Sequence, residues 1–559
     1  MADLVTRMYS NFLGADFRGE EINLNRSPDC LNVWKDYREI ESIRTRPEKE
    51  LLYSFDNTVY GIYFFTVGPR FMMLVHSGTT LYKIENGNRE SLYTGLNPRK
   101  SDSFIYNNIW YFKDGIHYLE YDGFTIKEVE GYVPTTSIGR KPNGGGSTYE
   151  DVNMLSDVRI NTFLADGEST EFHLDAKDID ATAQPLVRIN DIAVTNFTVD
   201  TVNGIIKFAE APPAPLTDGQ DNVWVKFQKT VQGHRNRINQ CTLLQVFDNR
   251  VFFSGNPDYP NVVWHCSLND PSYCSDLDYY NEGQDLARVT GMVAGNNALW
   301  VFKEPSQANT AVFYHNPTID SEYGKIYPST HSSVSTGCVG AAINFNDDIV
   351  FFSDRGMEAI NGDVTTEQAV SHRSSLVDRK LLAEESYKDM LLEEWEGYLL
   401  VIVGSKVYLA DSRTMFQNLN HYEYEWFYWD LGDEITCVKV YEGTLYLGAR
   451  NGIYTLTDGI ADVYSYWTTP LDKFGAPHKQ KTTNKRGCVV EATGYMTVKA
   501  KTDKSEWEDL GTYGNVTDYF VVSRKIKKFK DIQLRFSSDK RFSLETATLE
   551  AFLGGYIKR

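Results

Sequence analysis

The stretch Val440–Gly459, VYEGTLYLGARNGIYTLTDG, decides the fold class of this chain. It predicts a strand at Thr444–Leu447, a polar turn at 450–452 and a second strand at Ile453–Leu456. Tyr and Leu suit a half-buried pleated surface, and the Asn-Gly pair in the turn readily adopts the positive φ of a short hairpin. One such hairpin is common in all-β proteins, so its recurrence along the chain carries the prediction.

The same pattern occurs six more times. Each copy has an Asx or Gly turn and a run of apolar or aromatic residues, and most continue into a second polar turn and another strand. The six copies are Arg70–Ile84, Asn107–Leu119, Asp248–Gly255, Gly295–Lys303, Asp347–Ile360 and Gly397–Ala410. Repeated strand modules of this kind are typical of propellers and solenoids. We therefore expect an all-β protein with a β-propeller of about seven blade-like units, and six to eight units fit the pattern.

Changes in composition divide the chain into five predicted parts. They are an N-terminal docking arm (1–50), the first part of the propeller (51–150), an inserted small β-sandwich (151–231), the remainder of the propeller (232–464) and a basic C-terminal β-sandwich (465–559). The insertion is predicted because its short strands have a different spacing from the propeller units. Since insertions into repeat arrays map to loops on one face, we expect it to project from the surface.

Three local predictions accompany this division. The arm is polar and is interrupted by Pro28 and Pro47, so we expect it to be extended and to need other surfaces to order it. Arg140–Tyr149, RKPNGGGSTY, has the composition of a flexible linker. Ser374–Glu394 is the one convincing helix, because its Leu, Val and Met residues can share a face.

The composition is that of an ordinary globular protein. Of 559 residues, 42% are hydrophobic and 24% are charged. No apolar run approaches the roughly 18 residues of a membrane span. The N-terminal sequence lacks the apolar region of a secretory signal, which predicts folding in the cytoplasm of the cell that makes the protein. The seven cysteines form no CxxC pair, so we expect buried thiols in a reducing compartment.

Charge is distributed unevenly along the chain. The net charge is −20, yet residues 465–559 contain 18 Lys and Arg against 11 Asp and Glu, which gives +7 and leaves −27 for the remainder. This split predicts different partners at the two ends, or a self-repelling inner surface. A solvated face that keeps the protein soluble explains the charge equally well.

A basic run, Arg524–Lys530 (RKIKKFK), dominates the C-terminal part. In a strand, alternate side chains would share one face. The candidate partner-binding face consists of Lys479, Lys481, Arg524, Lys528 and Lys530. Such a face could meet an acidic protein, which we favour, or the phosphates of a nucleic acid, although nothing in it can distinguish bases. A solvent-exposed face is the third interpretation.

The sequence contains no recognisable motif for catalysis, cofactors or metals. GxxxxGK[ST], GxSxG and HExxH are absent, and the ten histidines are isolated from one another and from cysteine. The Asp-box turns of sialidase propellers are also absent. We interpret the acid pairs Glu393–Glu394 and Asp347–Asp348 as a helix end or a turn rather than an active site. If either pair lay in a strand, its two side chains would point to opposite faces. We therefore predict no catalytic, cofactor-binding or metal-binding residue.

The N-terminal arm, FRGEEINLNRSPDCLNVWKD followed by IRTRPEKELL, resembles the opening of the tail nozzle, or packaged-DNA stabilisation, proteins of tailed bacteriophages. The matching residues are Phe17, Gly19, Arg26, Ser27, Pro28, Asp29, Asn32, Thr45, Arg46 and Pro47. The phrase departs from the family pattern at its fifth position, which is Glu21 rather than Asp or Asn. The segments SSVSTGCVGAAINFNDDIVFFSDRGMEAI and WTTPLDKFGAPHKQKT are also similar to a blade phrase of this family and to the transition into its last domain.

The resemblance implies a non-enzymatic structural protein of the virion tail, assembled in the host cytoplasm. Six copies would form a ring below the portal and adaptor proteins, extend the DNA channel, retain packaged double-stranded DNA and conduct it at ejection. Tail fibre or spike proteins would be further partners. The implied adaptor-docking residues are Phe17, Arg18, Gly19, Arg26, Ser27, Pro28, Asp29 and Arg46.

Two alternatives remain. The 35 Tyr and 10 Trp residues suit a carbohydrate-binding or carbohydrate-cleaving propeller of a phage receptor-binding apparatus, because aromatic faces stack on sugars. A cellular scaffold propeller is the other.

Overall fold

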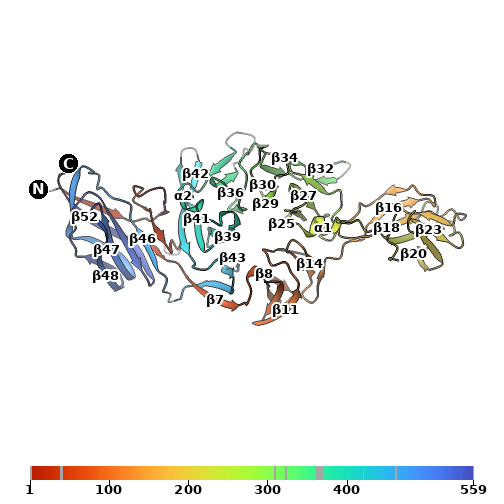
Figure 1. Ribbon diagram of the computed structural model, residues 1–559, viewed down its shortest axis with the longest axis horizontal. Coiled ribbons are helices and arrows are strands. Elements are labelled where there is room, and N and C mark those ends of the chain that lie inside the picture. Colours follow the sequence, from red (N-terminus) through yellow and green to blue (C-terminus); the bar gives the residue numbers. More distant parts are fainter. Residues whose placement is uncertain are drawn as a thin grey trace.

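The computed structural model has three parts arranged along its longest axis (Figure 1). It describes residues 3–37, 42–307, 310–321, 324–360, 369–418, 421–459 and 462–557. A C-terminal sheet lies at one end, a propeller in the middle and the inserted domain at the other end. Both chain termini lie at the end formed by the C-terminal sheet.

Seven four-stranded antiparallel sheets make up the middle part in the described residues. Each of the first four sheets is built from strands that are consecutive or nearly consecutive along the chain. These sheets are β8 (Val59–Val67), β9 (Arg70–Ser77), β10 (Thr80–Glu85) and β11 (Asn88–Thr94); β12 (Asp102–Tyr106), β13 (Ile109–Lys113), β14 (Tyr118–Tyr121) and β15 (Ile126–Glu128); β25 (Leu243–Phe247), β26 (Arg250–Ser254), β27 (Val262–His265) and β28 (Tyr279–Asn281); and β29 (Val289–Gly295), β30 (Ala298–Lys303), β31 (Val312–His315) and β34 (Ser329–His331).

The seventh sheet is completed by a strand from the other end of the sequence. The last three sheets are β35 (Ala342–Phe345), β36 (Asp348–Ser353), β37 (Gly356–Ile360) and β38 (Val370–His372); β39 (Leu391–Trp395), β40 (Tyr398–Val403), β41 (Lys406–Asn418) and β42 (His421–Asp430); and β43 (Ile435–Tyr441), β44 (Thr444–Ala449), β45 (Gly452–Thr457) and β7 (Glu48–Ser54). Strand β7 pairs antiparallel with β45, from Gly452 opposite Ser54 to Thr457 opposite Glu48. The N-terminal segment thus closes the array.

The first strands of the seven sheets form a closed circle. Around this circle β8, β12, β25, β29, β35, β39 and β43 each contact the next, and β43 contacts β8. The protein is therefore a seven-bladed β-propeller, and the prediction of fold class is confirmed. Each of the seven predicted hairpin segments falls in a different blade.

A two-residue turn with positive φ joins the first and second strands in six of the blades. The six turns are Asn107–Asn108, Asp248–Asn249, Asn296–Asn297, Asn346–Asp347, Glu396–Gly397 and Glu442–Gly443. Two consecutive positive φ angles define a type I′ turn, whose twist matches that of the flanking strands and which favours Asn, Asp and Gly. The turn predicted at 450–452 is a different one, between the second and third strands of the seventh blade. Ala449 pairs with Gly452, so only Arg450 and Asn451 lie between these strands, and no residue from 450 to 452 has the positive φ that was expected.

The inserted domain is a small β-sandwich with its own core. Its six-stranded sheet contains β16 (Thr135–Arg140), β17 (Ser147–Thr148), β18 (Val158–Phe163), β24 (Val223–Gln228), β20 (Leu186–Ile189) and β21 (Ile192–Val194), and its second sheet contains β19 (Glu171–His173), β23 (Ile205–Phe208) and β22 (Phe197–Asp200). Phe163, Phe172 and Val225 are buried between the sheets. The linker prediction for Arg140–Tyr149 is wrong. Its three glycines lie in the hairpin between β16 and β17, so the sheet includes residues before the expected boundary at 151.

In the described residues, the C-terminal part is a branched sheet of eleven strands. It contains β46 (Ser465–Thr468), β47 (Lys479–Thr502), β48 (Ser505–Val516), β49 (Tyr519–Val522), β50 (Lys527–Phe529), β51 (Ile532–Ser538) and β52 (Phe542–Tyr556), together with β1 (Leu4–Tyr9), β4 (Cys30–Leu31), β5 (Val33–Trp34) and β6 (Ile43–Thr45). The last four strands come from the predicted arm. The arm was expected to need other surfaces to order it, and for these strands the C-terminal sheet of the same chain provides them.

Helix is rare in the part of the chain that the structure describes. The described residues contain α1 (His234–Asn239), α2 (Asp378–Leu381) and the 3₁₀ turn η1 (Tyr387–Asp389), besides the two-stranded sheets β2 (Gly14–Ala15) with β3 (Arg26–Ser27) and β32 (Thr318–Asp320) with β33 (Gly324–Ile326). The predicted helix Ser374–Glu394 is wrong, because only the short helix α2 and the 3₁₀ turn η1 form there and Leu391 begins the inner strand of the sixth blade. None of the helices described is long and apolar enough to cross a membrane.

Candidate functional site

The residues that carry the family resemblance lie where the propeller meets the C-terminal sheet. Arg26 forms an ion pair with Glu425 on β42, and its guanidinium carbon lies 4.3 Å from the centre of the Phe416 ring. Ser27 donates a hydrogen bond of 2.7 Å from its hydroxyl to the carbonyl oxygen of Thr468. Both side chains are buried. They connect the N-terminal segment to both neighbouring domains.

Asp29 and Arg46 extend this junction. Asp29 accepts hydrogen bonds from the Tyr466 hydroxyl at 2.9 Å and from the Arg535 guanidinium at 2.6 Å. Arg46 donates to the side-chain oxygen of Asn32 at 3.0 Å and to the carbonyl oxygen of Asp430 at 3.1 Å. Burial lowers the pKa of Arg46 to about 10, and the nearby Asp430 carboxylate opposes that shift.

The other predicted docking residues are less uniform. Phe17 is buried, with its ring edge-on to Tyr428 at 5.8 Å between centroids. Arg18 is exposed and binds the carboxylate of Asp16 with both Nε and Nη2. A Cβ added at Gly19 would meet no atom within 4 Å, and Pro28 is half-buried. The structure therefore brings most of the predicted docking residues together, but inside the molecule.

Only some of the five residues of the predicted basic face are exposed to solvent. Arg524, Lys528 and Lys530 are exposed, and Lys479 is half-buried. Lys481 is buried, and its ammonium donates to the carbonyl oxygens of Ala476 at 2.7 Å and Lys530 at 2.6 Å. Burial lowers the pKa of Lys481. The prediction that Lys481 belongs to a partner-binding face is therefore wrong, because its ammonium connects two segments of its own domain.

The single strand expected over Arg524–Lys530 is also not formed. Strand β50 covers only Lys527–Phe529, and Lys528 has a φ of 56°. The alternation of side chains along a strand therefore does not determine on which side these Lys and Arg residues lie. Lys504 and Arg524 donate to the carbonyl oxygens of Lys528 and Asp509, respectively, so part of the basic charge holds neighbouring turns.

The propeller axis contains a cavity that sequence reasoning did not identify. Its volume is about 580 Å³, and the first strand of every blade contributes to its lining. The charged residues that line it are Lys100, Asp102, Lys388, Asp389 and Glu434. They come from segments far apart in the sequence, so no local motif could have indicated them.

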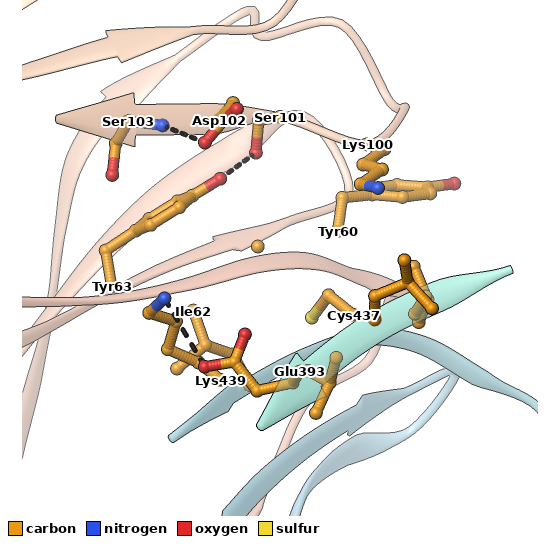
Figure 2. A pocket seen from close by; sticks show the side chains of 14 residues that line it. Tyr60, Ile62, Tyr63, Lys100, Ser101, Asp102, Ser103, Glu393, Cys437 and Lys439 are labelled. Atoms are coloured by element: carbon orange, nitrogen blue, oxygen red, sulfur yellow. Dashed lines mark hydrogen bonds and ion pairs between the residues drawn. The ribbon is translucent and has the colours of Figure 1, made fainter. Parts of the chain in front are cut away.

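A smaller cavity of about 250 Å³ lies beside the axis, between the inner strands of the first, second, sixth and seventh blades. Figure 2 shows Asp102 and Ser101 on one side of it and Glu393 and Lys439 on the other. Asp102 accepts a hydrogen bond of 2.8 Å from the backbone N–H of Ser103. Burial raises the pKa of Asp102.

Glu393 is engaged in contacts between blades. Its carboxylate accepts a hydrogen bond of 3.0 Å from the backbone N–H of Val440 and lies 3.5 Å from the ammonium of Lys439. These contacts join β39 to β43. A glycosidase needs two carboxylates that flank a bound sugar and are free to exchange protons. Glu393 instead holds two blades together.

The remaining acid pair also has structural contacts. Asp347 lies in the type I′ turn before β36, with a φ of 63°. Asp348 accepts hydrogen bonds from Arg373 at 2.9 Å and from the hydroxyl of Tyr424. Within the described ranges, no group of three or more His, Cys, Asp and Glu residues is placed to hold a metal ion.

The comparisons with known proteins give distant structural likenesses. No protein-family model matches the chain, and no curated protein sequence matches it. The computationally designed Ika8 protein is 12% identical, with a TM-score of 0.31 over 73% of this chain and 99% of its own. BamB from Moraxella catarrhalis is 10% identical, with a TM-score of 0.31 over 73% and 97%. The exo-β-1,3-galactanase from Phanerochaete chrysosporium is 8% identical, with a TM-score of 0.20 over 93% and 100%.

Proposed function

We propose that this chain is a structural subunit of the tail nozzle of a tailed bacteriophage. In this role six copies form a ring below the portal and adaptor, extend the DNA channel, retain packaged DNA and conduct it at ejection. The observation that carries the proposal is the position of the family-like residues. Arg26, Ser27, Asp29 and Arg46 lie at one buried junction between the propeller and the C-terminal sheet.

A rigid junction suits a subunit that carries mechanical load. Paired buried charges are costly to separate, since removing one partner leaves the other uncompensated. Arg26 and Glu425 form such a pair, and the next residue, Ser27, adds its hydrogen bond to Thr468. The propeller and the C-terminal sheet would then move as one body, as the wall of a pressurised channel requires.

The charge of the protein supports passage of DNA. A net charge of −20 repels the phosphate backbone, so DNA would not be retained by counterion release at the channel wall. The positive charge is concentrated in residues 465–559. We assign its exposed members, Arg524, Lys528 and Lys530, to contact with an acidic portal, adaptor or tail protein.

The burial of several predicted docking residues changes the role that we propose for them. Because Arg26, Ser27 and Arg46 are buried within the chain, they would shape the docking surface without touching the adaptor. Arg18, Glu20 and Glu21 are exposed in the same segment and would supply direct contacts.

Mass spectrometry of purified virions, followed by electron microscopy of their tails, tests the proposal. We expect six copies of the chain in a ring next to the portal–adaptor complex. Absence of the chain from virions would overturn the proposal. The charge reversal Arg18→Glu should weaken binding of the purified chain to the portal–adaptor complex, whereas Lys127→Glu, at an exposed position on the propeller, serves as the control.

A further inference from the structure

The inserted domain has a cleft at the end of its six-stranded sheet. The cleft has a volume of about 360 Å³ and lies between the β20–β21 turn and the loop 215–221. Figure 1 shows this domain at the end of the molecule opposite the C-terminal sheet. A ligand could therefore reach the cleft without contacting the propeller.

Trp224 forms the aromatic part of the lining. It lies on β24 between two cross-strand neighbours, Arg188 on β20 and Thr162 on β18. The guanidinium carbon of Arg188 is 5.0 Å from the centre of the indole ring. Trp224 is half-buried, whereas Val223 and Val225 on either side are buried in the core of the domain. Strand alternation thus fixes the indole on the outer face of the sheet.

The polar part of the lining combines one anchored carboxylate with several free groups. Asp221 uses Oδ2 to accept hydrogen bonds from the Gly139 N–H at 2.8 Å and from the Thr162 hydroxyl. In the described part of the chain, the side chains of Asn190, Asp191 and Gln220 have no hydrogen-bond or ion-pair partner. These groups can donate to and accept from a ligand.

The turn that holds Asn190 and Asp191 is rigid. Both residues have positive φ, 49° and 63°, and they join Ile189 to its pair Ile192 as a two-residue hairpin. The Asn190 N–H also donates to the Asn222 carbonyl oxygen at 2.8 Å. A fixed turn presents its polar side chains at low entropic cost, which favours ligand binding.

The chemistry of the lining excludes several ligand classes. Among the described residues the cleft is lined by Asp191 and Asp221 and by no Lys or Arg. Arg188 lies beside the Trp224 ring, but the two carboxylates outnumber this nearby cation and disfavour an anion such as a phosphate. Seven of its eleven lining residues have polar side chains, which does not suit an apolar peptide. An uncharged ligand with one apolar face and several hydroxyl groups fits both the indole and the polar groups.

We propose that this cleft binds a hexopyranose unit of an uncharged polysaccharide. The C–H face of the sugar would pack on Trp224, and its hydroxyl groups would donate to Asp221 Oδ1 and Asp191 and exchange hydrogen bonds with Asn190 and Gln220. Neighbouring sugars of the chain would extend into solvent past Leu216, which is 94% exposed on the rim. This inference is independent of the role proposed for the propeller and the C-terminal sheet.

Saturation-transfer NMR with the full-length chain tests the proposal. The probes are maltotriose, lactose and N,N′-diacetylchitobiose at millimolar concentration, followed by a microarray of bacterial polysaccharides. We expect saturation transfer to the ring protons of at least one sugar. Trp224→Ala should weaken this binding at least roughly tenfold. Gln220→Ala and Asp191→Asn should each weaken it as well, and both leave the core of the domain unchanged because their side chains are exposed.

Trp507 provides the matched control. It is also half-buried on a strand, with the Arg535 guanidinium carbon 4.4 Å from its ring centre, but it lies in the C-terminal sheet and does not line this cleft. Trp507→Ala should bind the sugar as the unchanged protein does. Absence of binding by all probes and by the array would overturn the proposal, as would equal loss in Trp224→Ala and Trp507→Ala.

Discussion

Arg26 and Glu425 form a buried, two-point ion pair between the N-terminal segment and the outer strand of the sixth blade. Arg26 Nε lies 2.9 Å from Glu425 Oε2, and Nη2 lies 2.5 Å from Oε1. The side chains are 9% and 1% exposed. A planar guanidinium and a carboxylate match in this geometry, so the pair fixes orientation as well as distance. The ion pair thereby fixes the N-terminal segment against the sixth blade, although the two residues are 399 positions apart in the sequence.

Replacing Arg26 should strongly destabilise the protein. In Arg26→Met the carboxylate of Glu425 stays buried without its partner, which costs about 3–5 kcal/mol. The urea midpoint, followed by tryptophan fluorescence, should fall accordingly. The double variant Arg26→Met/Glu425→Leu should recover most of the loss, because it removes the unpaired charge.

An exposed ion pair provides the control for this prediction. Arg288 and Glu304 are 65% and 36% exposed, with 3.6 Å between Nη2 and Oε2. Solvent screens such pairs, so Arg288→Met should cost about 0–1 kcal/mol. Equal effects of Arg26→Met and Arg288→Met would contradict a structural role for the buried pair.

A second prediction concerns closure of the propeller by β7. A Cβ on Gly452 would lie 2.4 Å from the carbonyl oxygen of Tyr53, too close for contact. Gly452→Ala should therefore loosen β7 from β45, and amides of Glu48–Ser54 should exchange hydrogen roughly tenfold faster, by mass spectrometry. Gly555→Ala, where a Cβ meets nothing within 4 Å, is the control. Unchanged exchange in Gly452→Ala would show that β7 is not held by this pairing.

The blades could be predicted from sequence because their decisive signals are local. Asn107–Asn108 and Asp248–Asn249 lie directly between the strands they connect, and their residue types favour positive φ. The closing strand β7 has no such signal. Its partner β45 lies about 400 residues further along the chain. The two strands can meet only after the other blades have packed in a circle, so no local sequence signal could have indicated their pairing.

The failed predictions also have physical causes. Leu376 and Leu381 are buried as an amphipathic helix would require, but the chain must supply β39 to the sixth blade soon afterwards. Lys481 is charged and would be expected outside, yet two carbonyl oxygens satisfy its ammonium inside. The clefts at the propeller axis and at Trp224 combine residues from separate strands, so neither has a sequence motif.

A third prediction concerns the cysteines. All seven are free and buried, as the sequence predicted, and burial raises the pKa of Cys266 and Cys488 to about 12. The thiolate is the reactive form, so the native protein should react with Ellman's reagent very slowly. All seven thiols should react after unfolding in urea. Rapid reaction of several thiols in the native protein would contradict this packing.

The last prediction concerns His372, which lies between two carboxylates. Its Nε2 is 2.6 Å from Asp378 Oδ2, and its Nδ1 is 3.3 Å from Glu358 Oε1. Burial lowers the pKa of His372, but the hydrogen bonds to Asp378 and Glu358 outweigh it and raise the pKa from 6.5 to about 10. The folded state therefore binds the proton more tightly than the unfolded state does.

The sign of the pH dependence follows from this raised pKa. The stability that protonated His372 contributes is fully present below pH 6.5 and is lost as the pH rises through about 10. His372→Gln lacks this contribution, so its melting temperature should lie below that of the unchanged protein at pH 6, and the gap should narrow steadily up to pH 10. His331→Gln, at an exposed position at the end of β34, is the control. A gap for His372→Gln that stays constant across this range would contradict a charged His372.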